Sequence, residues 1–275
     1  MPTVDLHIHT TATPHHSSWD PQVLAAAAAQ RGLAAIAAVD HNTTGGVLAL
    51  QAAGLQHGLR VVAGVEFDSA FGGKLWHTLV YGVPADAPDL LALCDAVYVS
   101  NMADAGSLFQ ALPRYGLILN GLDTLGRPPN VADVATALAR QNDLPDRIPG
   151  EDDENAGMRY LLTQVPHGYT PLNVADIIAV AHRLGGLAVL AHPGRSKGIY
   201  AVPATAEDIA ALVAVGLDGL EVYYPSHSPA QTTFYHEQAQ LHGLLITGGS
   251  DSHHPSQPLA SWDSELCQAF LDRVS

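Results

Sequence analysis

The chain opens with Thr3-Val4-Asp5-Leu6-His7-Ile8-His9, a stretch that predicts a short buried strand because it starts apolar and follows Pro2. Residues two apart in a strand point to the same side, so His7 and His9 can bind one metal ion while Ile8 faces the opposite way. A lone His-x-His pair is only a moderate signal. It gains weight here because four more apolar runs end in a residue that can bind a metal.

Apolar runs of strand length recur along the chain, with helix-like patterns between them. The expected strands are Thr3–Ile8, Ala34–Val39, Leu59–Val65, Leu75–Tyr81, Leu187–Leu190, Gly219–Val222 and Leu244–Thr247. The expected helices outside the middle of the chain are Pro21–Ala29, Gly46–His57, Asn173–Leu184, Ala206–Val215 and Ser228–His242. Strands that alternate with helices favour βαβ units and a parallel sheet, and seven of them favour an α/β barrel that is not fully closed.

The rhythm changes in the middle of the chain, where loops rich in proline and glycine alternate with helix-like pieces such as Asp86–Val99 and Val131–Gln141. We therefore predict a barrel built from residues 1–85 and 172–275, with a mostly helical insertion over residues 86–171 that caps one end of it. The acidic run Glu151-Asp152-Asp153-Glu154 lies inside the insertion and is expected to be a solvated loop.

Composition narrows the class of protein. The 275 residues are 47% hydrophobic, with no run of about eighteen apolar residues and no basic-then-apolar N-terminus, so a cytoplasmic protein without membrane segments is expected. Cys94 and Cys267 lie far apart and are expected to be free thiols. The net charge of −15 argues against binding long nucleic acid, whereas a small anionic phosphorylated substrate could still bind if metal ions supply positive charge.

Potential metal ligands stand at or near the ends of most expected strands, and barrel enzymes assemble their sites at the carboxyl ends of their strands. After His7 and His9 these are Asp40, His41, Glu66, His77, His192, Asp251 and His253. Nitrogen and oxygen ligands without thiolate favour zinc, manganese or iron(II). One tetrahedral zinc needs about four ligands, so a set roughly twice that size predicts a cluster of two or three divalent ions.

These residues occur in motifs that resemble, in order, those of the PHP family (polymerase and histidinol phosphatase domain). The stretches are Asp5–His9, Val39–His41, Gly64–Glu66, Ala191–Arg195 and Gly248–His253. The resemblance spans nearly the whole chain. It implies a distorted seven-stranded (βα)7 barrel that binds three metals through nine ligands.

By position, the resemblance implies three groups of ligands. The first metal would be held by His7, His9, Glu66 and Asp251. Glu66 would bridge to a second metal that is also held by His77 and His192. The third would be held by His41, His253 and one residue from the loop after the first strand.

That loop departs from a common family pattern, because Pro14 stands where many members have an aspartate ligand. A phosphatase branch of the family instead uses a histidine six residues after the second histidine of His-x-His. His15 has this spacing and is assigned as the ligand, with His16 as the alternative.

The C-terminal half resembles a narrower group, the 3′,5′-nucleoside bisphosphate phosphatases and related exoribonucleases. The stretch Gly185–Arg195 is similar to their GG-x-A-V-x-A-H-P-G-R, and Leu220-Glu221-Val222 followed by Ser226-His227 is similar to their I-E-V…S-H. The insertion departs from the group, since Arg127-Pro128-Pro129-Asn130 stands where an R-x-H is expected.

Several residues are candidates for contacts beyond the metals. The Arg195 guanidinium matches phosphate oxygens and is the candidate phosphate clamp, with a surface salt bridge as the alternative. His227 is a candidate for binding phosphate or for protonating the leaving oxygen, or else an exposed loop histidine. Asp40 is expected to orient a ligand histidine. Tyr223 and Tyr224 could either line the pocket or pack in the core. The weaker candidates, on the side of the insertion, are Asn130, Arg159, Tyr169 and Lys197.

The expected activity is hydrolysis of a phosphomonoester by a metal-bridged hydroxide, with a 3′,5′-nucleoside bisphosphate as the first candidate substrate. Alternatives are histidinol phosphate, a sugar phosphate or the 5′ end of short RNA. A metal-dependent amide or lactone hydrolase is a further alternative, although Arg195 argues against it. The remaining alternative is a non-catalytic metal-binding module, which typically loses ligands that this chain keeps.

Overall fold

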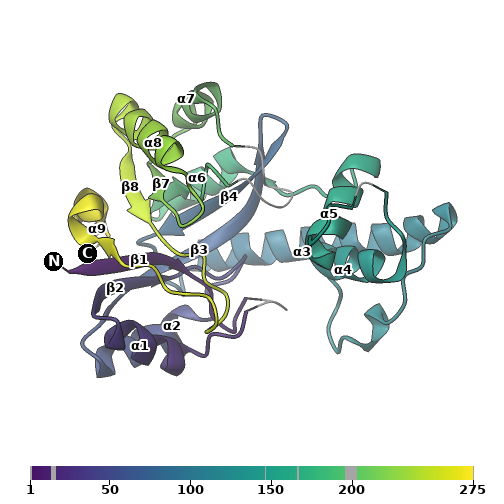
Figure 1. The fold of residues 1–275 in the computed structure, drawn as a ribbon, viewed down its shortest axis with the longest axis horizontal. Coiled ribbons are helices and arrows are strands. Elements are labelled where there is room, and N and C mark those ends of the chain that lie inside the picture. The colour runs from purple at the N-terminus through teal and green to yellow at the C-terminus, as the bar shows by residue number, and fades with distance from the viewer. Residues whose placement is uncertain (1, 14–16, 146, 166, 196–202, 275) are drawn as a thin grey trace. The chain divides into compact units, whose positions relative to one another are not determined.

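Strand β1 (Thr3–Ile8) lies near one end of a mixed sheet that also contains strands from the C-terminal half of the chain (Figure 1). In this computed structural model, residues 2–13, 17–145, 147–165, 167–195 and 203–274 are described. The sheet order is β8-β7-β6-β4-β3-β2-β1-β9, and the short strand β5 pairs with β3. The other strands are β2 (Leu33–Ala38), β3 (Arg60–Phe71), β4 (Lys74–Tyr81), β5 (Leu172–Asn173), β6 (Leu187–Leu190), β7 (Gly219–Tyr223), β8 (Leu245–Gly248) and β9 (Trp262–Asp263).

The two ends of the sheet meet beside β1, so the sheet is nearly closed. The N–H of Asp251 donates to the carbonyl of His7 (2.8 Å), and the N–H of His9 donates to the carbonyl of Ser252 (3.0 Å). These bonds join the end of β1 to the segment that follows β8. The prediction of an α/β barrel that is not fully closed is confirmed, and the seven expected strands all form, with the two-residue strands β5 and β9 in addition.

The expectation of a parallel sheet was wrong for one of the seven expected strands. β4 runs antiparallel to both of its neighbours, β3 and β6. Phe71 pairs with Lys74, and the two residues between them, Gly72 and Gly73, both have positive φ (60° and 77°), which is the backbone of a tight hairpin turn. The pair Gly72-Gly73 was the sequence signal for this hairpin. β3 therefore continues six residues beyond Val65, where the prediction ended it.

The helices begin and end with local signals that the sequence contains. α1 (Pro21–Gln30) begins after Asp20, whose carboxylate accepts from the N–H groups of Gln22 and Val23. α8 (Pro229–His242) begins with a capping box from Ser228 and ends at Gly243 in the left-handed region. The remaining barrel helices are α2 (Val47–Gln56), α6 (Val174–Arg183), α7 (Ala206–Ala214) and α9 (Gln268–Arg273), with a 3-10 turn at Ser264–Cys267.

The chain divides into two compact units. Among the described residues, one contains those within 1–95, 172–195 and 203–275, and the other contains those within 96–171. Helix α3 (Pro88–Ala111) contributes to both. The second unit also contains α4 (Val131–Gln141), α5 (Asp153–Gln164) and the 3-10 turns Leu112–Tyr115 and Leu122–Thr124, and it has its own buried cluster that includes Leu108, Val134, Leu138 and Leu161.

The acidic run in the second unit is not the solvated loop that we expected. Asp152 caps α5 by accepting from the N–H of Asn155 (2.8 Å). Asp153 lies in the first turn and pairs with Arg140 (2.9 Å) and Arg147 (2.7 Å), and Glu151 pairs with Arg159. Carboxylates are favourable at a helix N-terminus, where the N–H groups lack partners within the helix. The acidic run is therefore a helix start.

In the first unit, one buried cluster includes Leu6, Leu79, Val189 and Phe270, and a second packs α1 and α2 against the sheet through residues such as Leu24, Leu50 and Ile36. Cys94 and Cys267 are both buried and free, as expected. Among the residues that the structure describes, none of the helices is long and apolar enough to cross a membrane.

Candidate metal centre

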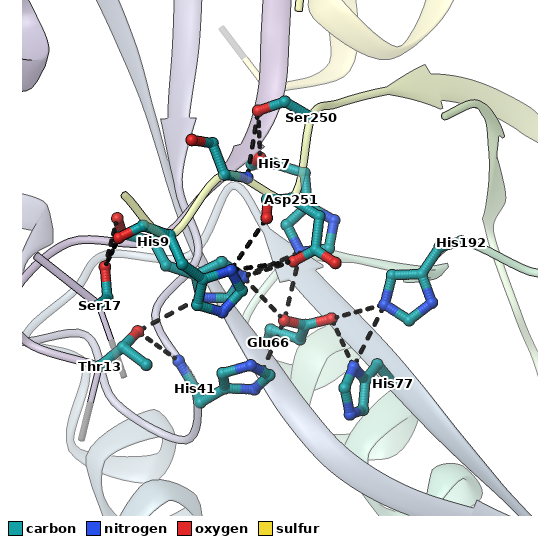
Figure 2. A network of polar contacts seen from close by, with 12 residues as sticks. His7, His9, Thr13, Ser17, His41, Glu66, His77, His192, Ser250 and Asp251 are labelled. Carbon is teal, nitrogen blue, oxygen red and sulfur yellow. Dashed lines mark hydrogen bonds and ion pairs between the residues drawn. The ribbon is translucent and has the colours of Figure 1, made fainter. Parts of the chain in front are cut away.

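The ends of β1, β2, β6 and β8 bring histidines and carboxylates to one buried place beside Glu66 of β3 (Figure 2). His77 reaches the same place from the first half of β4, because an antiparallel strand starts at the edge where its parallel neighbours end. The sequence placed His77 at the start of its strand, whereas it is the fourth residue of β4. The hairpin explains why a residue inside a strand belongs to a set of strand-end ligands.

Glu66 is fully buried and lies at the centre of the cluster. Its Oε2 lies 3.2 Å from Nε2 of His7, 3.1 Å from Nε2 of His9 and 3.5 Å from Nδ1 of His41. A buried carboxylate is costly unless it is paired, and these three imidazoles supply partners on one side.

The other oxygen of Glu66 faces a second pair of rings. Oε1 lies 2.9 Å from Nδ1 of His77 and 3.3 Å from Nε2 of His192, and these two nitrogens are 3.2 Å apart. One carboxylate thus joins two sets of imidazoles, as expected for a ligand that bridges two ions.

Asp251 completes the group on the Oε2 side of Glu66. Its Oδ1 lies 3.1 Å from Nε2 of His9 and 3.5 Å from Nε2 of His7, and those two nitrogens are 3.2 Å apart. A tetrahedral ion with ligands at about 2.0–2.1 Å separates neighbouring ligand atoms by about 3.3 Å. The spacing of these nitrogens and oxygens therefore fits a divalent cation such as zinc, and the first predicted group comes together in full.

Two further groups have ligand atoms that all lie within 4.8 Å of one another: His41, Glu66 and His77, and His9, His41 and His253. The group of His41, Glu66 and His77 overlaps the predicted second-metal group, but it contains His41 where the prediction had His192. His192 still lies within hydrogen-bond distance of both Glu66 and His77. The second overlaps the predicted third-metal group. His15 and His16 lie outside the described residues, so the ligand from that loop stays a prediction.

The charges in this cluster shift the pKa values of its members strongly. Burial alone would raise the pKa of Glu66, but His7, His77 and His41 hold it well below its ordinary value. For Asp251, burial is likewise outweighed by His7, by the hydrogen bond from His9 and by His253, so its pKa is well below normal. Both carboxylates are therefore ionised and can bind a cation.

The pKa is raised for some of the imidazoles in the cluster and lowered for others. Burial opposes protonation of His9, but hydrogen bonds to Asp251 and Glu66 raise its pKa to about 9. Burial together with the charge of His9 lowers the pKa of His253 to about 3, and burial lowers the pKa of His192. His253 and His192 are thus neutral, the form in which imidazole binds metals.

Asp40 does not contact His9 directly, because Thr13 stands between the two residues. It accepts from the hydroxyl of Thr13 (2.7 Å) and from the N–H and hydroxyl of Thr10 (2.6 and 2.7 Å). Since the Thr13 hydroxyl donates to Asp40, it accepts from Nδ1 of His9 (3.3 Å), which leaves Nε2 of His9 as the nitrogen that faces the cluster. Asp40 thus orients a ligand histidine through Thr13.

Two carboxylates beside the cluster were missed as site residues. Glu221 lies 3.0 Å from Nδ1 of His7, and Asp68 lies 3.4 Å from Nε2 of His77 and 3.7 Å from Nδ1 of His41. Glu221 stands in an otherwise apolar strand, a signal that the sequence did contain. Asp68 was hidden because β3 was expected to end at Val65.

Arg195 lies at the edge of the cluster, with Nη1 3.7 Å from Oδ2 of Asp251 and 28% of its side chain exposed. Tyr224 donates to the same oxygen of Asp251 (3.0 Å). The guanidinium is therefore partly accessible beside a metal-ligand carboxylate, as a phosphate clamp would have to be.

His227 is engaged on both ring nitrogens. Nδ1 donates to the carbonyl of Val222 (2.9 Å), so Nε2 is the acceptor for the N–H of Gly194 (3.0 Å). Burial also lowers the pKa of His227, which favours this neutral form. These contacts support neither the expected general-acid role nor direct binding of phosphate, because no ring proton is left to donate.

The weaker candidates are mostly occupied elsewhere. Asn130 caps α4, accepting from the N–H of Asp133 (2.8 Å), and Arg159 pairs with Glu151. Tyr169 packs against the core of the second unit, Tyr223 against Trp262, and Lys197 lies outside the described residues.

Two of the candidate ligand residues have strained backbone. His192 and Asp251 have φ of 27° and 56°, in a region that non-glycine residues rarely adopt. Gly249 lets the loop after β8 pass close to β1, since a Cβ there would lie 2.6 Å from the backbone nitrogen of His7. Such strain is common where a site must hold side chains in one geometry.

Comparison with known proteins agrees with this geometry. A family model described as the PHP domain matches residues 5–142. Phosphoribosyl 1,2-cyclic phosphate 1,2-diphosphodiesterase of Eggerthella lenta is 33% identical over 260 residues, covering 90% of this chain and 93% of that protein. 3′,5′-nucleoside bisphosphate phosphatase of Chromobacterium violaceum is 28% identical over 265 residues, covering 94% and 89%.

Solved structures share the fold over the full length. An amidohydrolase from Chromobacterium violaceum, solved with bound sulfate and no metal, has a TM-score of 0.75 at 27% identity and covers 98% of this chain and 96% of its own. A structure from Bifidobacterium adolescentis has the same TM-score at 22% identity, covering 99% and 96%.

The nearly closed mixed sheet is barrel-like, and its buried histidine–carboxylate clusters are consistent with a multi-metal site. The chain belongs to the PHP domain family, and with these clusters it is a metal-dependent phosphoesterase of that family.

Proposed function

We propose that this protein hydrolyses a phosphate ester carried by a ribose, and that a 3′,5′-nucleoside bisphosphate, a monoester, is the first candidate substrate. The main support for this proposal is the position of Arg195, whose partly exposed guanidinium lies at the edge of the buried cluster of candidate metal ligands. A carbonyl substrate would not need this cation, whereas a phosphate can accept two hydrogen bonds from it.

Two or three ions of zinc, manganese or iron(II) would be held by His7, His9, His41, Glu66, His77, His192, Asp251 and His253, with His15 as the predicted ninth ligand. When bound, such ions lower the pKa of a coordinated water and polarise phosphoryl oxygens. The carboxylates of Glu66 and Asp251 would offset the positive charge of these ions, and the contact of Nδ1 of His9 with Thr13 leaves Nε2 of His9 facing them.

Arg195 would bind the non-bridging phosphate oxygens next to Asp251. We assign His227 to positioning, since its Nε2 accepts from the N–H of Gly194, the residue before Arg195. Local positive charge from the ions and from Arg195 lets a protein of net charge −15 accept a small anionic substrate.

A second candidate is a cyclic phosphate diester on ribose, favoured by the 33% identity to the cyclic phosphate diphosphodiesterase of Eggerthella lenta. The relatives that suggest the two candidates both act, by their names, on phosphorylated ribose compounds. The two reactions differ in product, because a cyclic diester opens to a monoester before any inorganic phosphate appears.

The test is a panel of substrates followed by ³¹P NMR with protein reloaded with Mn²⁺, including adenosine 3′,5′-bisphosphate, phosphoribosyl 1,2-cyclic phosphate, ribose 5-phosphate, histidinol phosphate, a 5′-phosphorylated dinucleotide and a lactone. We expect the bisphosphate to release inorganic phosphate fastest. Faster ring opening of the cyclic ester would select the second candidate.

The test variant is Glu66→Ala, which removes the central carboxylate. Its matched control is Glu265→Ala, which removes an exposed one. Glu66→Ala should lose metal and more than about 100-fold of the activity, since changes around the ligands alone cost about 10–100-fold. Activity that persists in Glu66→Ala, or hydrolysis of the lactone alone, would overturn the proposal.

A further inference from the structure

Glu221 is a buried carboxylate, 1% exposed, in the middle of β7. Its Oε1 and Oε2 lie 3.0 and 3.2 Å from Nδ1 of His7, and its Oε2 accepts the backbone N–H of His192 (2.7 Å). It belongs to none of the three groups of ligand atoms. Its two partners nevertheless contact different oxygens of Glu66, since His7 lies beside Oε2 and His192 beside Oε1.

The contact to His7 decides which ring nitrogen faces the cluster. Both oxygens of Glu221 face Nδ1 of His7, and one of them already accepts the N–H of His192, so Nδ1 of His7 carries the proton that it donates. In the neutral ring that a metal needs, Nε2 is then the nitrogen with the lone pair, and it lies 3.2 Å from Nε2 of His9 and 3.2 Å from Oε2 of Glu66.

The contact to His192 supports a strained turn. His192 has φ of 27° and precedes Pro193, whereas residues before proline favour extended backbone. The hydrogen bond from its N–H to Glu221 offsets part of this strain. It thereby helps to hold Nε2 of His192 3.3 Å from Oε1 of Glu66.

The carboxylate has little room to take another position. A Cβ added at Gly249 would lie 2.8 Å from Oε1 of Glu221 and 2.6 Å from the backbone nitrogen of His7. The loop after β8 therefore packs against Glu221 and His7 together, and it is the same loop that carries Asp251.

We propose that Glu221 is a positioning residue of the metal centre, which sets the tautomer of His7 and the turn of His192 so that metal affinity on both sides of Glu66 depends on one carboxylate. This inference rests on the metal centre of the proposed function. It adds a residue that neither binds a metal nor touches substrate.

The decisive variant is Glu221→Gln. Glutamine has one acceptor oxygen, so it can serve either His7 or the N–H of His192, while its own NH₂ group faces the other donor. We expect the dissociation constants for Mn²⁺, measured by competition with a chelator, to rise by about 10–100-fold. The visible spectrum of bound Co²⁺ should change as well, because the ligand geometry changes.

The matched control is Asp218→Asn, just before the other end of β7. Asp218 makes the same pair of contacts away from the metal centre: it accepts from Nε2 of His182 (2.8 Å) and from the backbone N–H of Ala188 (2.8 Å). Asp218→Asn should lower the melting temperature without changing Mn²⁺ affinity or the Co²⁺ spectrum.

If both variants lose stability alike and Glu221→Gln keeps the wild-type Mn²⁺ affinity, the inference is wrong. If the wild-type protein itself binds no Mn²⁺, the proposed function fails instead. A measurement on the wild type covers the case in which Glu221→Gln does not fold: ¹⁵N NMR of Zn²⁺-loaded protein should show His7 protonated at Nδ1, and metal on Nδ1 would refute the assignment.

Discussion

At the scale of single residues, a substitution of Arg195 can distinguish an effect on substrate binding from an effect on metal binding. We predict that Arg195→Ala raises KM by about 10- to 100-fold with little change in kcat, the loss expected for charged hydrogen bonds to a phosphate. Steady-state kinetics on the best substrate of the panel will check this. An unchanged KM with weaker Mn²⁺ binding would mean instead that the guanidinium, 3.7 Å from Asp251, serves only that carboxylate.

We expect His9 to make metal binding depend on pH. Carboxylate partners raise its pKa to about 9 in the metal-free protein, although burial opposes this, and the pKa of His7 is also raised well above its ordinary value. A metal ion needs the neutral rings, so binding below pH 9 must displace protons.

We predict that Mn²⁺ affinity rises between pH 6.5 and about 9 by about tenfold per pH unit for each proton displaced, and then levels off for His9. Calorimetry in two buffers with different heats of ionisation will count the protons released. A flat affinity over this range would contradict the assignment of His9 as a proton-competing ligand.

At the scale of elements, helices α4 and α5 approach closely at Gly157. A Cβ there would lie 2.7 Å from the Cα of Ala135 and closer still to its carbonyl group, all of it backbone that cannot move aside cheaply. Gly157→Ala should therefore destabilise the second unit by about 1–3 kcal/mol through overpacking.

Gly106 in α3 is the matched control, since a Cβ there meets nothing within 4 Å. Gly106→Ala should be neutral or stabilising by up to about 1 kcal/mol, as alanine favours helix. Urea unfolding of both variants gives the comparison, and an equal loss in both would refute the packing explanation.

Some helices and strands were predicted from the sequence and others were missed. Helix α4 was predicted with its observed bounds, and in the structure Asn130 caps its start. Helix α5 was missed because its acidic start resembles a solvated loop, and its partners Arg140, Arg147 and Arg159 become neighbours only when α4 and α5 pack. The β3–β4 hairpin was missed although Gly72-Gly73 signals it.

At the scale of the whole molecule, all the described ligand residues belong to one of the two compact units. A ligand that binds only the folded state stabilises it, by about 2.7 kcal/mol at a concentration 100 times its dissociation constant. We predict that Mn²⁺ slows hydrogen exchange in β1, β3 and β6 and leaves α4 and α5 nearly unchanged.

Hydrogen exchange read by mass spectrometry, with and without Mn²⁺, tests this prediction. The Glu66→Ala variant serves as the control in which no protection should appear. Equal added protection in α4 and α5 would show that the two units respond to the metal as one.

The sequence by itself determined which ligand types are present and that most of them stand at strand ends. This is local information, since alternation along a strand and apolar runs between turns involve neighbouring residues. The tertiary structure alone decided that Glu66 joins the two sets of imidazoles and that Glu221 faces His7 across 214 positions of sequence. Those facts depend on how a nearly closed sheet brings distant strands together, and no local pattern of residues encodes that closure.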